Sequence, residues 1–160
     1  DVKGGWFAGQ VRHDRFKVNG ESLAFRGVRI VNRTEGACIH FDGSVEDGLV
    51  EGSSIENCGT NAIRVGWPGA TVKQFRAPNN VIRRWNMSGA GYPGMEIVGG
   101  LATLAQSKVN DNVFSGPVGT PPAIACGSPG NDVDLSRNAT AGLPVINCPM
   151  ASPSSLVVHP

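Results

Sequence analysis

The sequence predicts an all-β chain of solenoid type, in which short strands stack repeat upon repeat. Three observations support this. A pair of apolar residues spaced five apart recurs along the chain, and a second apolar position follows each pair at a nearly constant distance. Glycine is abundant, at 22 of 160 residues, while only 17% of residues are charged. A constant repeat body joined by loops of variable length is typical of solenoids, whose repeats bury their apolar residues on one another.

The recurring pairs, here called opener pairs, are Phe25…Ile30, Val50…Ile55, Ile82…Met87 and Val109…Phe114, with a degraded copy at Val133…Asn138. Because five is an odd number, both members can face inward only if the chain turns a corner between them. Residues that tolerate a left-handed backbone stand at this corner in three copies, namely Gly27, Gly52, Asp111 and Asn112. The third copy places Arg83 and Arg84 there, which fits less well.

The second apolar position, here called the inner column, is held by Ile39, Ile63, Met95, Ile124 and Ile146. Short alternating runs around these residues predict strands with one buried face. Two positions further on, a second set is predicted to face inward: Phe41, Val65, Ile97, Cys126 and Cys148. The residues between the two sets are predicted to face outward as a ladder: His40, Arg64, Glu96, Ala125 and Asn147.

Repeats of about 25 residues with three short strands each describe a parallel β-helix. The stretches 48–59, 61–65 and 80–89 resemble the right-handed parallel β-helix superfamily, which includes pectate lyases, polygalacturonases, alginate epimerases and lyases, and phage tailspikes. The resemblance covers roughly residues 23–148 and implies a right-handed helix of about five turns. Residues 1–22 are expected to form an incomplete first turn or a cap, and the Pro/Ser-rich residues 149–160 to form a tail.

The resemblance implies a polysaccharide-engaging module of a secreted carbohydrate-active enzyme or of a phage tailspike. Its location would be extracellular, secreted or virion-associated, and any enzyme activity would be that of a polysaccharide lyase or glycoside hydrolase. The Asn-Thr-Asp, Asp-Asp and His-Gly segments of polygalacturonases do not occur here. Arg76 and Arg83 are similar to the pectate lyase Arg-x-Pro-x-x-Arg motif, but the second arginine comes two residues late.

A non-catalytic structural or assembly module is the alternative function. The short chain, the missing catalytic motifs and the open ends expected of a solenoid favour it. Such a module would form a homo-oligomer, for example a trimer, or would continue in a longer chain.

The outward ladder permits two interpretations. In one it is a solvated sheet face, where Arg64 and Glu96 form a cross-strand ion pair worth about 0.2–1 kcal/mol. In the other it lines a groove for a polysaccharide, with Arg64 binding a carboxylate and His40 or Glu96 transferring protons. Asp42 flanks the ladder and is a further candidate ligand-binding residue.

Two loop aromatics complete the candidate binding residues. Trp67 lies in a Gly-Trp-Pro-Gly loop and Tyr92 in a Gly-Tyr-Pro-Gly loop. Each ring could stack on a sugar or pack over the edge of the solenoid. The Trp67 loop falls in the interval from Val50 to Ile82, the longest between openers, and long solenoid loops commonly build the binding face.

Composition and cysteine spacing exclude several partners. A net charge of +1 provides no strong field for nucleic acid or an anionic membrane, and no apolar run is long enough to span a bilayer. The cysteines lack metal-ligand spacing and no acidic cluster suits calcium, so neither a metal nor another cofactor is expected. Cys126 and Cys148 share the inward column, where either a disulfide or buried thiols would fit. Asn-x-Ser/Thr triplets begin at Asn32, Asn86 and Asn138.

Overall fold

The computed structural model describes residues 2–8, 20–21, 24–31, 36–41, 43–98, 107–127 and 133–148. All regular secondary structure in this part of the chain is β-strand, and every strand pairing is parallel, which confirms the all-β prediction. None of the described segments is a helix long and apolar enough to cross a membrane.

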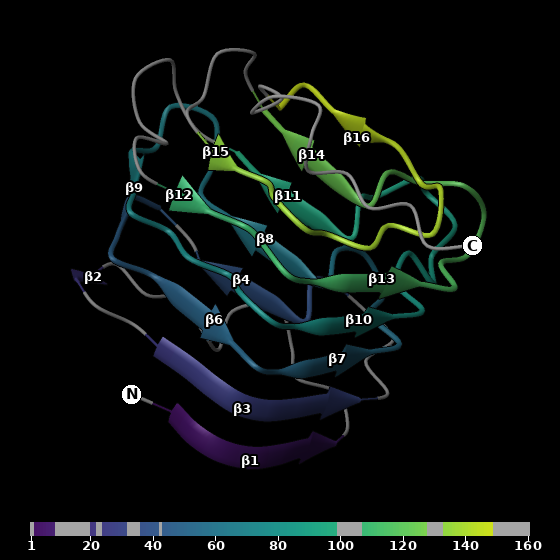
Figure 1. The fold of residues 1–160 in the computed structure, drawn as a ribbon, viewed down its shortest axis with the longest axis horizontal. Helices are drawn as coiled ribbons and strands as arrows, with labels where there is room; N and C mark the ends of the chain where they lie inside the picture. The colour runs from purple at the N-terminus through teal and green to yellow at the C-terminus, as the bar shows by residue number, and fades with distance from the viewer. Residues whose placement is uncertain are drawn as a thin grey trace.

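The strands form four parallel sheets in which neighbours follow chain order (Figure 1). The first sheet holds β1 (Val2–Ala8), β3 (Ala24–Val31), β6 (Leu49–Glu51), β7 (Ser54–Glu56), β10 (Val81–Arg83) and β13 (Val113–Ser115). The second holds β4 (Ile39–Phe41), β8 (Ile63–Val65), β11 (Met95–Ile97), β14 (Ile124–Cys126) and β16 (Val145–Ile146). The two smaller sheets hold β2 (Gly20–Glu21), β5 (Val45–Glu46) and β9 (Val72–Lys73), and β12 (Ser107–Lys108) and β15 (Val133–Asp134).

The predicted inner column is confirmed over its first four members. β4, β8, β11 and β14 pair in a register that aligns Ile39, Ile63, Met95 and Ile124, and all four are fully buried. The prediction of the last member was wrong by one residue, because Ile124 pairs with Val145 and Ile146 is 41% exposed. Burying this column excludes water from the space between the sheets and provides the main favourable free energy of folding.

The third opener pair is also displaced from its predicted place. Ile82 aligns with Ile55 and Phe114, so it is the second member of its pair, and Met87 is 39% exposed. The first member is Ala77, which is fully buried and whose N–H donates to the Lys108 carbonyl of the next repeat. The longest interval therefore runs from Ala77 to Val109 and includes residues 99–106, outside the described residues. The prediction that the Trp67 loop occupies the longest interval was wrong.

The fifth opener pair is Leu135…Thr140 instead of Val133…Asn138. The Val109 N–H donates to the Asp134 carbonyl, and Val113 forms a bridge with Ala139, which places Thr140 beside Phe114. In this register, the corner residue is the second residue after the first member of each opener pair. It has a positive φ in every repeat: Gly27 (60°), Gly52 (57°), Asn79 (59°), Asp111 (57°) and Arg137 (55°). The poor fit of the two arginines at the predicted third corner was thus an error of register.

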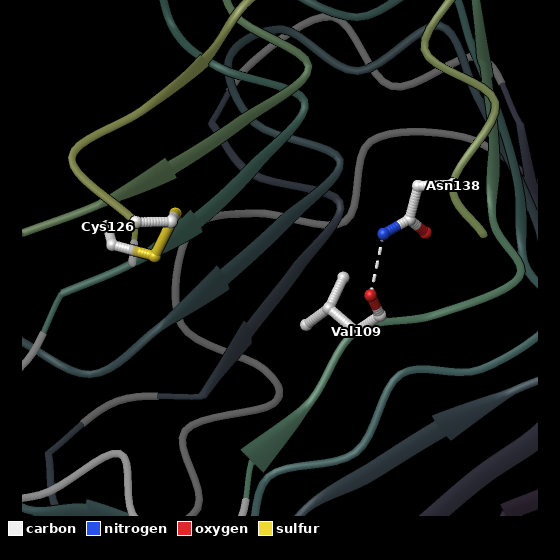
Figure 2. Close-up of a disulfide and its surroundings, with 4 residues drawn as sticks. Val109, Cys126 and Asn138 are labelled. Atoms are coloured by element: carbon white, nitrogen blue, oxygen red, sulfur yellow. Dashed lines mark hydrogen bonds between the residues drawn. A yellow bond between two sulfur atoms is a disulfide. The ribbon is translucent and has the colours of Figure 1, made fainter. Parts of the chain in front are cut away.

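A column of buried side chains follows the corners. Ser53 directly follows the corner residue of its repeat, and the equivalent residues of the next three repeats are Asn80, Asn112 and Asn138. We call these three asparagines the amide column. Each amide oxygen accepts the backbone N–H of the equivalent residue one repeat earlier, at 3.0 Å for Ser53, 2.9 Å for Asn80 and 3.0 Å for Asn112. Each amide nitrogen donates to a carbonyl of that repeat, as Figure 2 shows for Asn138 and Val109. The amide column therefore satisfies backbone groups that the corners bury.

Two disulfides join neighbouring repeats. Cys126 and Cys148 are bonded (Figure 2), with their Cα atoms 4.9 Å apart, which settles the choice between a disulfide and free thiols. Cys38 and Cys58 are also bonded, at a Cα separation of 5.5 Å, a pairing that the spacing alone did not indicate.

The two glycosylation triplets within the described residues do not offer free amides. Asn86 and Asn138 are both buried, and their amide nitrogens donate to backbone carbonyls. Asn32 lies outside the described residues, as does the predicted tail at 149–160. The domain limits at residues 22 and 148 stay predictions.

Candidate functional site

The predicted outward ladder is present on the second sheet. The central residues of β4, β8, β11 and β14 align as His40, Arg64, Glu96 and Ala125, and the first three are half-buried. Each is flanked by two buried residues, because alternate side chains of a strand point to opposite faces. Ile146, and not the predicted Asn147, continues the ladder beside Ala125.

Arg64 and Glu96 form an ion pair along the ladder. Arg64 Nε lies 3.3 Å from Glu96 Oε2, and the two side chains are 25% and 26% exposed. The contact does not have hydrogen-bond geometry, and these two buried atoms have no hydrogen-bond partner among the described residues. No hydrogen bond from that part of the chain reaches the two Nη groups of Arg64 or Oε1 of Glu96 either. The pair is therefore charge-balanced but rich in unused donors and acceptors.

Trp67 packs beside the ladder. Its ring centroid is 4.8 Å from Cζ of Arg64 and 5.4 Å from the His40 ring. The loop begins at Gly66, where only glycine fits, because φ is 75° and a Cβ there would lie 2.4 Å from the Val98 carbonyl oxygen. Trp67 is 42% exposed, so one part of the ring covers the guanidinium while another part faces solvent.

Tyr92 is held by a buried asparagine. Asn86 Oδ1 accepts the N–H groups of Gly91 and Tyr92, both at 3.0 Å, and Asn86 Nδ2 donates to the Val118 carbonyl. The loop is thereby fixed while the Tyr92 side chain stays 38% exposed. This arrangement presents a positioned aromatic ring at the surface.

A pocket of about 100 Å³ connects these elements, lined by Gly36, Ala37, His40, Thr60, Arg64 and Tyr92. The pocket spans three repeats, since Gly36, Thr60 and Tyr92 each precede their ladder residue by four positions. Sequence reasoning missed Gly36, Ala37 and Thr60. Extending the alignment of the inner column three residues upstream would have identified Gly36 and Thr60.

The structure brings together five of the six predicted site residues, in three different ways. His40, Arg64 and Tyr92 line the pocket, while Trp67 contacts two of them from the side. Glu96 reaches the site through Arg64 and does not line the pocket. Asp42 lies outside the described residues.

The ladder geometry suits binding better than proton transfer. His40 and Glu96 are two strand spacings apart, about 9–10 Å, with Arg64 between them. Glu96 turns one carboxylate oxygen toward Arg64 and so restrains the guanidinium. Within the described residues, no group of three or more His, Cys, Asp or Glu could hold a metal ion.

An ion pair away from the pocket lining shifts the pKa of both of its partners. Arg137 donates to both carboxylate oxygens of Asp111, at 2.6 and 2.7 Å. These hydrogen bonds lower the pKa of Asp111 and raise that of Arg137. Both residues stand at left-handed corners of neighbouring repeats, so the pair is part of the scaffold.

Comparisons of the chain with protein-family models, with curated proteins and with solved structures found no match. Function is therefore inferred from the geometry of the pocket and the ladder.

Proposed function

We propose that the chain is a right-handed parallel β-helix of about five turns that engages a polysaccharide through the pocket and the outward ladder. Parallel pairing of successive repeats in chain order supports the helix, whose turns would begin at Phe25, Val50, Ala77, Val109 and Leu135. Crossover connections between parallel strands of one sheet are right-handed in nearly all proteins, which supports the hand.

The observation that carries the binding function is the lining of the pocket. It combines an exposed aromatic ring, Tyr92, with the polar side chains of His40, Thr60 and Arg64, and three successive repeats contribute to it. Sugars present apolar C–H faces and hydroxyl edges, so an aromatic beside hydrogen-bonding groups is a suitable surface for them. The volume is well below the roughly 300–1,000 Å³ of pockets that enclose a ligand, so the polymer would lie across the surface and insert one edge.

The two disulfides support an extracellular, secreted or virion-associated location. Disulfides persist in oxidising compartments and are rare in the reducing cytosol. Both bonds join neighbouring repeats and would stabilise the fold outside the cell.

A structural or assembly module is the second candidate. The observation that favours it is that charges on the outer faces are paired between neighbouring repeats: Arg26 with Glu51, Asp47 with Arg76, Glu56 with Arg83, Arg64 with Glu96, and Asp111 with Arg137. Ion pairs between neighbouring repeats would stiffen a spacer without providing a ligand-binding site. A module of this kind would act as a trimer or within a longer chain.

A glycan array, followed by reducing-end and ultraviolet product assays, separates the candidates. We expect the wild type to bind at least one polysaccharide, and Tyr92→Ala to lose that signal while keeping its circular dichroism spectrum. Product formation that His40→Ala abolishes would add a lyase or hydrolase activity to binding. A stable trimer that binds no glycan would contradict the proposal and support the structural module.

A further inference from the structure

We propose that the pocket selects a neutral sugar residue with adjacent hydroxyl groups over a carboxylated one. The inference rests on the proposed polysaccharide-binding function and specifies its ligand class. It differs from the expectation, drawn from sequence, that Arg64 binds a sugar carboxylate.

The charge of Arg64 is already compensated. Glu96 lies 3.3 Å from Arg64 Nε, and the Trp67 ring lies 4.8 Å from Cζ. A sugar carboxylate that approached the guanidinium would also approach the Glu96 carboxylate, one strand spacing of about 4.8 Å further along the sheet. Attraction to one charge and repulsion from the other would largely cancel, so the pair acts against anionic ligands.

The ladder offers no further cation on the C-terminal side. Beyond Glu96 the aligned residues are Ala125 and Ile146, which are uncharged. A polyuronate carries a charge on every residue and would lie over Glu96 and then over this apolar surface. A neutral chain meets no such mismatch, because Ala125 is buried and the C–H faces of such a chain suit the exposed Ile146.

The unused hydrogen-bonding groups match hydroxyls. The Nη groups of Arg64 donate only, Oε1 of Glu96 accepts only, and the Thr60 hydroxyl in the pocket does both. Two adjacent sugar hydroxyls can each accept from one group and donate to another, which satisfies a donor and an acceptor held side by side. The ring of Tyr92, 38% exposed, is available for the C–H face of the same sugar.

Calorimetric titration of the whole chain tests the selectivity. The probes are cello-, manno- and galacto-oligosaccharides on one side and oligogalacturonate and alginate oligosaccharides of equal length on the other. We expect the best neutral probe to bind the wild type at least about tenfold more tightly than either uronate.

Glu96→Gln provides the sharper test, because it keeps the size of the side chain and removes the negative charge that compensates Arg64. We expect uronate affinity to rise about tenfold in this variant and to fall again with added salt, while affinity for the neutral probe falls severalfold. Glu56→Gln is the matched control, since it makes the same change in the Glu56–Arg83 pair on the first sheet. It should leave both affinities unchanged.

The outcomes separate the two proposals. Uronate binding to the wild type as tight as neutral binding, or no uronate gain in a Glu96→Gln variant with unaltered thermal unfolding, would overturn the ligand class alone. Absence of binding by every probe would overturn the polysaccharide-binding function, and the ligand class with it. The wild-type comparison needs no variant and decides the ligand class even if Glu96→Gln fails to fold.

Discussion

The amide column and the outward ladder are both rows of polar side chains that run across successive repeats, yet they differ in how they are satisfied. Asn80, Asn112 and Asn138 are buried, and the oxygen and nitrogen of each amide bond to protein groups. In the ladder, Arg64 and Glu96 are a quarter exposed, and their facing atoms form an ion pair without a hydrogen bond.

This difference separates architecture from function. Each amide of the column is hydrogen-bonded within the folded protein itself, so this saturated column holds the scaffold and has nothing to offer a ligand. Partly exposed groups with unused donors and acceptors can exchange water for a ligand at little cost. Substitutions in the two rows should therefore act on different measurements, stability in one and binding in the other.

The largest effect is expected for Asn112→Ala. It removes the acceptor of the Asn80 N–H and the donor to the Ala77 carbonyl, and leaves both buried without partners. At about 1–3 kcal/mol for each group, the free energy of unfolding should fall by about 4 kcal/mol. Urea denaturation measures this loss, with Asn110→Ala as the control, because the Asn110 side chain is only partly buried and bonds to Asp111. A loss below about 1 kcal/mol would show that the amide column is not structural.

Removing a disulfide tests the scaffold on the side of the ladder. Cys126 follows Ala125 in β14, and its bond to Cys148 closes a loop with a sequence separation of 22. Replacing both cysteines by alanine should lower the free energy of unfolding by about 3 kcal/mol, through the added entropy of the unfolded chain. Thermal unfolding of the double variant beside the wild type checks this, and equal stability of the two proteins would contradict it.

Substitutions at the pocket should weaken binding and leave stability almost unchanged. Tyr92→Ala, Arg64→Ala and Trp67→Ala remove half-exposed or exposed groups, so each should change stability by about 1 kcal/mol or less. Each should weaken glycan binding by about tenfold, because one stacking or charged contact is worth on the order of 1 kcal/mol. Titration of the three variants measures this. Unchanged affinity in all three would leave the ladder as ordinary sheet surface.

The smallest effect concerns the Asp111–Arg137 pair at the corners. Hydrogen bonds from Arg137 hold the pKa of Asp111 below its ordinary value of 3.8. The resulting stabilisation is complete above that value and is lost as the pH falls through the lowered pKa. Asp111→Asn should therefore reduce stability slightly at neutral pH, and the difference from wild type should vanish in acid. Unfolding midpoints recorded from neutral pH downward test this, and a difference that grows in acid would contradict it.

The inner column and the outward ladder could be predicted because the alternation of strands is a strong local signal. Ile39, Ile63, Met95 and Ile124 each have a polar or small residue on one side and an apolar one two positions later. The signal failed at the last strand, since Val145 and Ile146 are both apolar and periodicity cannot decide which one faces inward.

The amide column and the third opener could not be predicted from hydrophobicity. Asn80, Asn112 and Asn138 lie inside, because burial is tolerated when every hydrogen bond is made, a condition that only the neighbouring repeat reveals. Ala77 is too small to stand out as an apolar position, and Ile82…Met87 imitates the five-residue spacing by chance. Asn79 at the left-handed corner was the available clue.

The pocket was only partly predictable. Arg64 and Tyr92 were recognised by residue type, whereas Gly36, Ala37 and Thr60 carry no chemical signal of their own and line the pocket through register. The cation–π contact of Trp67 with Arg64 depends on the path of its loop, which spacing along the sequence does not determine.

Chemical-shift mapping by NMR tests the central claim most directly, that the outward ladder binds and the amide column does not. The wild-type chain would be titrated with whichever neutral oligosaccharide binds best in calorimetry. We predict saturable shifts of the Thr60, Arg64 and Tyr92 amides, with the side-chain amides of Asn80 and Asn112 unmoved. Shifts centred on another face, or no shifts at saturating concentrations of the sugar, would contradict the account.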